Sequence, residues 1–299
     1  MHLLKLFFLF FSLIFIFSCS SSYEKLSTNT FDSPNIFSKY LLETYKTKAD
    51  FEANEMHDWN SAKLYSEKAL GATKGKEIKP EKISYWNIPS DKLSELNIAY
   101  ENLMAVYNEA LSLDPYNLAK AISSLDCWAE QQEENWQTWD IKKCRENFLS
   151  AMHELYGSLS TKTEDTLKEN LNTEDPKIDS ASVVTQDTEN NILQIVYFDF
   201  DKAELSNVSI NEIKKFINTN GDKIEKFIII GHTDTKGTKK YNKKLSLERA
   251  QAVEKILLDL GIVKKNISLL AQGEDNLRIN TPDEIAHPAN RRAEISPLN

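Results

Sequence analysis

The hydrophobic pattern of residues 34–156 is that of amphipathic helices. Apolar side chains recur every three or four positions over Leu93–Leu111 and again over Ile141–Leu155, which predicts helices that turn one face to a shared core. Ser90-Asp91 is a typical helix start, and Asp114-Pro115 ends one helix and begins the next. Residues 34–156 are therefore predicted to form an all-α module.

A different pattern begins at about residue 191, where short strand-like segments alternate with helical ones. Segments rich in β-branched and aromatic residues predict strands over Ile192–Phe200, Phe227–Ile230, Ile267–Leu270 and Ala293–Ile295. Helices are expected around Ile210–Ile217 and over Leu245–Leu260. Helices that alternate with strands imply a sheet covered on one face, so the chain is expected to be α+β.

Residues 157–190 separate these two patterns. Thr, Asp, Glu, Ser and Asn dominate the segment, large apolar residues are sparse, and Asp175-Pro176 interrupts any helix. Such a composition buries too little apolar surface to offset the entropy of ordering, which predicts a flexible linker. A solvated helix over Glu164–Asn170 is the alternative.

The chain begins with an apolar run from Leu6 to Phe17 that follows Lys5. The run is shorter than the roughly 20 residues that a membrane-spanning helix needs, and it is typical of a secretory signal peptide over residues 1–18. The alternative is an uncleaved membrane anchor.

Ile16-Phe17-Ser18-Cys19 resembles the lipobox of bacterial lipoproteins. The resemblance implies cleavage before Cys19, acylation of that residue by chains such as palmitate, and a lipidated tether over residues 19–33. Ser20 after the cysteine resembles the signal for the outer membrane, so the chain is expected to be lipid-anchored there and to face the periplasm. Several acyl chains would make the anchor durable.

The chain has three cysteines. Lipidation of Cys19 leaves Cys127 and Cys144, which are expected to form a disulfide in an oxidising periplasm. Two antiparallel helices joined by the polar turn between them would bring the Cα atoms within disulfide range. The alternative is a pair of free core thiols. The nearby tryptophans are expected to pack in the core around the disulfide, with a partner-binding patch as the alternative: Trp128, Trp136 and Trp139.

Two helical segments, Leu64–Leu70 and Val106–Leu111, resemble the second helix of tetratricopeptide repeats. Their spacing does not match the repeat length, and the rest of the repeat signature is missing. The formal net charge of −9 argues against a nucleic-acid partner, because no excess of Lys and Arg is left to neutralise phosphates.

Four blocks in the C-terminal part resemble the OmpA-like peptidoglycan-binding family, which includes the Pal lipoproteins. In the order of the family, they are Val196–Asp201, Gly231–Gly237, Tyr241–Val253 and Asn290–Arg292. The resemblance implies an OmpA-like domain over residues 191–299, an α/β sandwich with a mixed four-stranded sheet. It also implies a non-catalytic lipoprotein that binds peptidoglycan and tethers the outer membrane to the cell wall.

The family's ligand is the stem peptide of peptidoglycan, usually at diaminopimelate, which carries a carboxylate and an ammonium on one carbon. By resemblance, Arg249 binds the carboxylate, for which a planar guanidinium offers two parallel hydrogen bonds. Asp201 and Asp234 resemble the acceptors around the ammonium.

Further contact positions of the family are matched by Asn242, Leu245 and Arg291. Arg292 is expected to pair beneath the last strand in a structural role. Asp234 and Arg249 are expected at the rim of the sheet and outside the core, where substitution would not disturb folding.

The first alternative to a non-catalytic binding function is an enzyme that acts on the cell wall. His232 and Asp234 would share a strand face, but a third zinc ligand at suitable spacing and a Ser or Cys nucleophile with a paired His are both missing. No catalytic residue, metal or cofactor is therefore expected. A flagellar-stator-like protein would need an acidic residue in a membrane-spanning helix, and Leu6–Phe17 has none. The remaining alternative is an envelope adaptor, in which the helical module binds another protein and wall binding only positions it.

Overall fold

The computed structural model describes residues 21–171 and 193–298. The predicted signal peptide, Cys19 and residues 172–190 of the predicted linker lie outside this description. Within it the chain forms two compact units: the chain up to Leu103 with Asp114–Ala151, and Met104–Leu113 with the chain from Met152 onward. No helix in the described ranges is long and apolar enough to cross a membrane.

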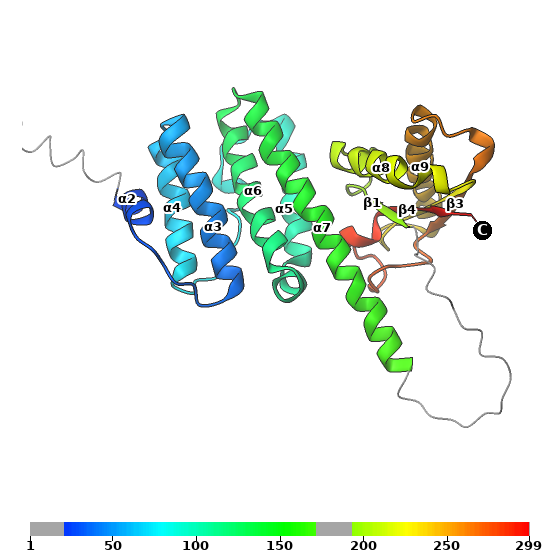
Figure 1. Cartoon of the computed structure of the whole chain (residues 1–299), viewed down its shortest axis with the longest axis horizontal. Coiled ribbons are helices and arrows are strands. Elements are labelled where there is room, and N and C mark those ends of the chain that lie inside the picture. Colours follow the sequence, from blue (N-terminus) through cyan, green and yellow to red (C-terminus); the bar gives the residue numbers. More distant parts are fainter. Residues whose placement is uncertain (1–20, 172–192, 299) are drawn as a thin grey trace, which may run out of the picture. The chain divides into compact units, whose positions relative to one another are not determined.

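Helices make up the described chain before residue 172 (Figure 1). They are α2 (Ser21–Thr28), α3 (Ile36–Phe51), the π-helix η1 (Glu52–Met56), α4 (Trp59–Thr73), the 3₁₀ turn η2 (Ile83–Tyr85), α5 (Ser90–Leu113), α6 (Pro115–Glu134) and α7 (Thr138–Leu171). As predicted, α5 begins at Ser90 and α6 at Pro115. Asp114 caps α6 by accepting a hydrogen bond from the backbone N–H of Asn117.

The helical part extends beyond its predicted limits at both ends. Residues 21–28 of the predicted tether form α2, where Leu26 is fully buried, because this segment has apolar side chains to place in the core. At the other end, α7 continues to Leu171, so a linker beginning at residue 157 is wrong. No proline occurs between Thr138, where α7 begins, and Pro176 to stop the helix, and Leu159 is buried on it.

Cys127 and Cys144 join α6 to α7 through a disulfide, with their Cα atoms 5.7 Å apart. Trp128 packs beside it, buried against Phe148. The expectation that all three tryptophans are buried is nevertheless wrong, because Trp136 and Trp139 are 65% and 66% exposed. Helix α6 ends at a left-handed Asn135, which directs the chain into a connection and leaves both tryptophans outside the core.

The chain from residue 193 forms a mixed four-stranded sheet, as predicted. Its strands are β1 (Gln194–Tyr197), β2 (Phe227–His232), β3 (Ile267–Gly273) and β4 (Arg292–Pro297), in the order β1-β4-β2-β3. Strands β2 and β3 are parallel, whereas β4 is antiparallel to β1 and β2. The α+β class is confirmed.

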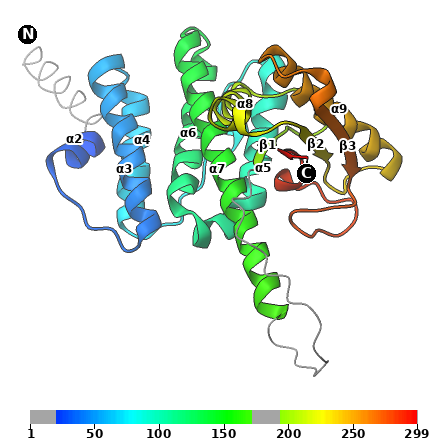
Figure 2. The same cartoon turned by 45° about the vertical axis from the view of Figure 1, so that its right-hand side comes forward.

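Two helices, α8 (Asn207–Asn220) and α9 (Lys239–Asp259), cover one face of this sheet (Figures 1 and 2). Short 3₁₀ turns occur at η3 (Gly221–Lys223), η4 (Lys264–Asn266) and η5 (Pro288–Asn290). Alternate strand residues turn inward to meet the helices and form a core that includes Val196, Ile213, Ile229, Val253 and Ile295.

Helix α9 crosses the end of β2 in direct contact. A Cβ at Gly231 would lie 1.8 Å from the backbone oxygen of Ser246, so only glycine allows this approach. The contact brings the first turns of α9 to the carboxyl end of β2, where the candidate site lies.

Candidate functional site

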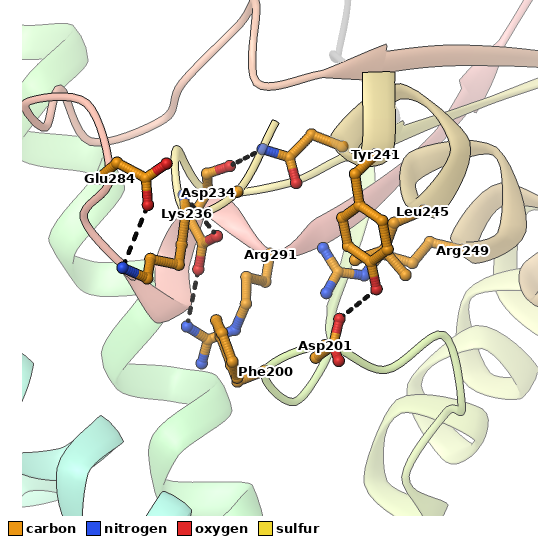
Figure 3. Close-up of a pocket in the computed structure, with 11 residues that line it drawn as sticks. Phe200, Asp201, Asp234, Lys236, Tyr241, Leu245, Arg249, Glu284 and Arg291 are labelled. Atoms are coloured by element: carbon orange, nitrogen blue, oxygen red, sulfur yellow. Dashed lines mark hydrogen bonds and ion pairs between the residues drawn. The ribbon is translucent and has the colours of Figure 1, made fainter. Parts of the chain in front are cut away.

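A cavity of about 220 Å³ opens where β2 ends and α9 begins (Figure 3). It is lined by Phe200, Asp201, Asp234, Lys236, Gly237, Tyr241, Asn242, Leu245, Arg249, Glu284 and Arg291. All six residues that the sequence suggests as ligand contacts are in this set. They come from four separate stretches of the chain, which the sheet and α9 bring together.

Strand ends and tight backbone turns position these side chains. Asp201 follows β1 in a left-handed conformation with φ 57°, which Asp tolerates better than most residues. Gly237 ends the loop after β2 with φ 102°, and Thr238 then caps α9 by accepting from the backbone N–H of Tyr241. Asn242, Leu245 and Arg249 follow at spacings of three and four, so α9 presents them on one face.

Arg249 is fully buried, with an exposed fraction of 0%. Its Nε donates to the Lys202 oxygen at 2.9 Å, Nη1 to the His232 oxygen at 2.8 Å and Nη2 to the Asp199 oxygen at 3.2 Å. Burial, followed by the charge of Arg291, lowers the Arg249 pKa to about 9. Within the described ranges its hydrogen-bond partners are thus backbone carbonyls, and it has no carboxylate in an ion pair.

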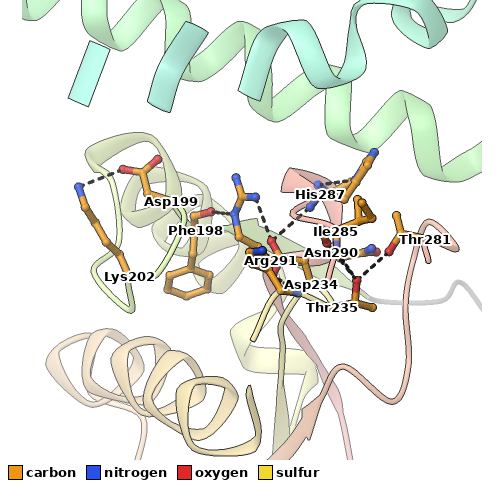
Figure 4. Close-up of polar contacts among 12 residues, drawn as sticks. Phe198, Asp199, Lys202, Asp234, Thr235, Thr281, Ile285, His287, Asn290 and Arg291 are labelled. Atoms are coloured by element: carbon orange, nitrogen blue, oxygen red, sulfur yellow. Dashed lines mark hydrogen bonds and ion pairs between the residues drawn. The ribbon is translucent and has the colours of Figure 1, made fainter. Parts of the chain in front are cut away.

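Asp234 is also buried, and it is bonded on both carboxylate oxygens (Figure 4). Its Oδ2 accepts from Arg291 Nη1 at 3.1 Å and from the His287 backbone at 3.2 Å, and Oδ1 accepts from the Lys236 backbone at 3.3 Å. Arg291 also donates to the Phe198 oxygen. The expectation that Asp234 and Arg249 lie at the rim of the sheet and outside the core is wrong, because both side chains are buried. The loop after β1 supplies backbone oxygens to Arg249, and the segment before β4 supplies donors to Asp234.

The other predicted contacts differ in their exposure. Asp201 is exposed and accepts a hydrogen bond from the Tyr241 hydroxyl (Figure 3). Asn242 is buried and donates from Nδ2 to the Asp234 backbone oxygen at 3.3 Å and to Glu274 Oε2 at 2.5 Å. Leu245, which is 7% exposed, supplies an apolar wall.

Some lining residues were not among the predicted contacts. Lys236 and Glu284 form an exposed ion pair at the mouth, with Nζ and Oε2 3.1 Å apart. Tyr241 precedes Leu245 by one helical turn, and this spacing is the signal that could have placed it in the pocket. Glu284 lies between β3 and β4 in a stretch without periodicity, and no sequence signal indicates its position.

His232 and Asp234 do not share this cavity. Asp234 lines it, whereas His232 is absent from the lining and faces Glu294, with Nε2 and Oε1 3.8 Å apart. Arg292 also pairs with Glu294, at 2.6 Å, in the structural role expected for it. Burial, followed by the charge of Arg292, lowers the His232 pKa to about 4.

The pocket combines charges of both signs within a small volume. Arg249 and Arg291 supply buried positive charge, Asp234 neutralises one of them, and Asp201 places an exposed carboxylate at the edge. Such an arrangement can hold a carboxylate and an ammonium that belong to one small group.

Comparison with known proteins gives a family for this part of the chain. The OmpA family pattern matches residues 197–291. A peptidoglycan-associated lipoprotein of Pseudomonas putida is 29% identical over 102 residues, which are 33% of this chain and 60% of that protein. One from Pasteurella multocida (strain Pm70) is 31% identical over 102 residues, which are 34% of this chain and 68% of that protein.

Among solved structures, the peptidoglycan-associated lipoprotein from Burkholderia pseudomallei is 28% identical and covers 34% of this chain and 87% of its own, with a TM-score of 0.31. The match spans less than two thirds of the Pseudomonas putida protein and just over two thirds of the Pasteurella multocida protein. Through the domain that contains the pocket, this chain belongs to the OmpA family.

Proposed function

We propose that this chain is a non-catalytic lipoprotein that tethers the outer membrane to the cell wall. Its pocket binds the stem peptide of peptidoglycan at diaminopimelate. Membership of the OmpA family and the names of the peptidoglycan-associated relatives support wall binding.

The observation that carries the proposal is that Arg249 is fully buried and donates to backbone carbonyls. A guanidinium has five N–H donors. Within the described ranges, Arg249 donates three hydrogen bonds, all to backbone carbonyls, which carry no net charge. A buried charge without a counter-ion is costly. A ligand carboxylate that enters the pocket would provide the counter-ion and accept further N–H groups.

Asp201 is the better acceptor for the ligand ammonium. The Asp234 carboxylate already binds Arg291 and two backbone N–H groups, so its main role is to orient Arg291. Asp201 is exposed at the pocket edge and is bonded at Oδ1 by Tyr241. An ammonium that reaches Asp201 would lie beside the carboxylate held by Arg249, as the geometry of diaminopimelate requires.

Sedimentation of the detergent-solubilised full chain with purified sacculi tests wall binding. We expect diaminopimelate-containing sacculi to pull down the protein, and sacculi with lysine in its place to pull down much less, because lysine lacks the second carboxylate. Asp201→Asn should weaken sedimentation, whereas the exposed Asp222→Asn, in η3 and away from the pocket, should not. Equal sedimentation of all samples would exclude the site.

Anchoring in the outer membrane, the other part of the proposal, depends on Cys19, which lies outside the described residues. The lipobox resemblance supports acylation of its thiol and amino group. Intact-mass measurement of detergent-extracted protein should show a mature chain that begins at Cys19 and carries the lipid mass. Recovery of an unmodified periplasmic product would contradict the tether, even if the pocket binds peptidoglycan.

The second candidate function is that of an envelope adaptor whose helical module binds another protein. The exposure of Trp136 and Trp139 favours it, since large aromatic side chains are enriched at protein interfaces. Trp136→Ala with Trp139→Ala should then abolish cross-linking to an envelope protein and leave sacculus sedimentation unchanged. Unchanged cross-linking would argue against this candidate.

A further inference from the structure

Helix α2 begins at Ser21, two positions after Cys19, and it is packed against the helical module. It contacts both α3 and α4 (Figures 1 and 2), and its Leu26 is fully buried. Near its start, Ser22 Oγ donates to Glu67 Oε1 on α4 at 3.4 Å. A helix of this length is marginal in water by itself, so these contacts hold α2 in place. The chain between Cys19 and the packed module is therefore very short.

This short connection limits how far the module can lie from a lipid anchor at Cys19. Two residues of fully extended chain span at most about 7 Å. The polar headgroup layer on each side of a bilayer is itself roughly 5–8 Å thick, from the difference between the whole bilayer and its hydrocarbon core. A lipidated Cys19 would lie where the acyl chains meet the headgroups. The start of α2 would then lie within this layer or directly on it.

The surface beside the start of α2 carries two aromatic side chains. Tyr23 is half-buried on α2, and Trp59, the first residue of α4, is 46% exposed. Their rings meet edge to face with centroids 6.1 Å apart, and the Tyr23 hydroxyl accepts from Asn54 Nδ2 at 2.8 Å. Tyr and Trp are enriched at membrane–water interfaces, because each has an apolar ring and one polar group. The pair is thus suited to contact with a bilayer surface.

The charges around this aromatic pair have both signs. Glu24 and Lys25 are exposed on α2, and Lys63 and Glu67 form an ion pair on α4, with Nζ and Oε1 3.9 Å apart. The chain as a whole has a net charge of −9, which does not favour anionic lipids. Contact with a bilayer would therefore depend on the aromatic pair and the anchor, and a zwitterionic phospholipid surface fits best.

We propose that the first turn of α2 and the start of α4 dock on the headgroup layer of the membrane that holds the anchor, with Tyr23 and Trp59 as the contacting side chains. This inference rests on the acylation of Cys19 proposed above. The helical module then lies against the membrane, and residues 19–33 do not act as a long tether. The docking surface and the peptidoglycan pocket belong to different compact units, so each can be tested without the other.

Quenching of tryptophan fluorescence by brominated lipid tests the docking surface. The full-length lipoprotein is reconstituted in vesicles of phosphatidylcholine whose acyl chains are brominated near the headgroup, with unbrominated vesicles as the reference. Bromine quenches only the tryptophans that lie close to it, so we expect the emission of the unaltered protein to fall. Trp59→Phe keeps a ring against Tyr23 and should lose most of this quenching. Trp139→Phe is the matched control and should retain it, because Trp139 is 66% exposed but lies on α7.

The intact mass of the same samples separates failure of the docking surface from failure of the anchor. A protein that carries lipid at Cys19 and shows no quenching would overturn the docking surface and leave the anchor in place. Equal quenching of Trp59→Phe and the unaltered protein, or its loss in Trp139→Phe, would show that another face meets the membrane and would also overturn it. Quenching that appears only when anionic phosphatidylglycerol is added would contradict a zwitterionic docking surface. A chain without lipid would contradict the anchor and the docking surface together.

Discussion

Arg291 Nη1 lies 3.1 Å from Asp234 Oδ2, and both side chains are buried at the pocket. The same carboxylate accepts from the backbone N–H groups of Lys236 and His287. Asp234 therefore connects the loop after β2 to the segment before β4 and to Arg291. Its negative charge therefore stabilises Arg291 and the two segments that form this wall of the pocket.

The first prediction concerns Asp234→Asn, which keeps the shape of the side chain and removes its charge. Arg291 would then keep a buried positive charge without this partner, a change that typically costs about 3–5 kcal/mol. We expect the C-terminal domain to lose stability on this scale and sacculus sedimentation to fall. Hydrogen exchange of C-terminal peptides in the full chain measures the stability. Exchange equal to that of the Asp222→Asn control would show that the ion pair contributes little.

The second prediction concerns Arg249→Lys. A lysine ammonium retains the charge but cannot donate in three fixed directions to the oxygens of Asp199, Lys202 and His232. We expect weaker sacculus sedimentation and faster hydrogen exchange around these carbonyls. Arg145→Lys is a suitable control, because Arg145 makes a half-exposed ion pair with Glu95 that lysine can preserve. If Arg249→Lys binds sacculi as well as this control does, the planar guanidinium of Arg249 does not bind the carboxylate of the ligand.

The sequence predicts the C-terminal sheet and the members of the pocket because local patterns encode both. An unbroken run of β-branched and aromatic residues marks β2, alternating apolar residues mark β4, and four ordered motifs supply Asp201, Asp234 and Arg249. Their burial could not be predicted in the same way. The burial of Arg249 depends on tertiary contacts with backbone oxygens after β1 and at the end of β2. Every residue has a backbone oxygen whatever its type, so no sequence motif marks these contacts.

The helical module shows a similar limit. The Cys127–Cys144 pairing follows from cysteine number and spacing, and the structure contains it. The exposure of Trp136 depends on the left-handed turn at Asn135, which composition does not indicate.

The third prediction concerns the disulfide, whose cysteines are 17 residues apart. Closing a loop of this size stabilises a fold by about 3 kcal/mol in the chain-entropy model. Reduction should therefore lower the urea midpoint of the helical module, followed by tryptophan fluorescence. A variant with Cys127→Ser and Cys144→Ser should start at the lower midpoint and show no response to reductant. If the urea midpoint of that variant also changes with reductant, the reductant acts at a site other than the Cys127–Cys144 disulfide.

The last prediction concerns the pH dependence of the C-terminal domain through His232. Burial, then the charge of Arg292, lowers the pKa of this imidazole from 6.5 to about 4, while Glu294 opposes the shift and Arg278 adds to it. Above pH 6.5 the His232 imidazole is neutral in both the folded and the unfolded chain, so it does not change the free energy of unfolding there. As the pH falls from 6.5 to 4, the unfolded chain binds a proton that the folded chain does not, and stability falls.

The loss approaches about 3 kcal/mol near pH 4, because each unit of pKa difference corresponds to about 1.4 kcal/mol. His287 has a pKa lowered to about 4 by burial and Arg291, and it contributes in the same direction. His232→Gln removes one of these two groups. The stability of the C-terminal domain can be measured at pH 7 and at pH 4.5 by urea unfolding followed by hydrogen exchange. The loss of stability between the two pH values should be smaller in this variant than in the unaltered protein. Exposed His57, which lies in the helical part, provides the control through His57→Gln, and this variant should retain the full difference. A His232→Gln variant with the same pH response as the control would show that the buried imidazole does not limit acid stability.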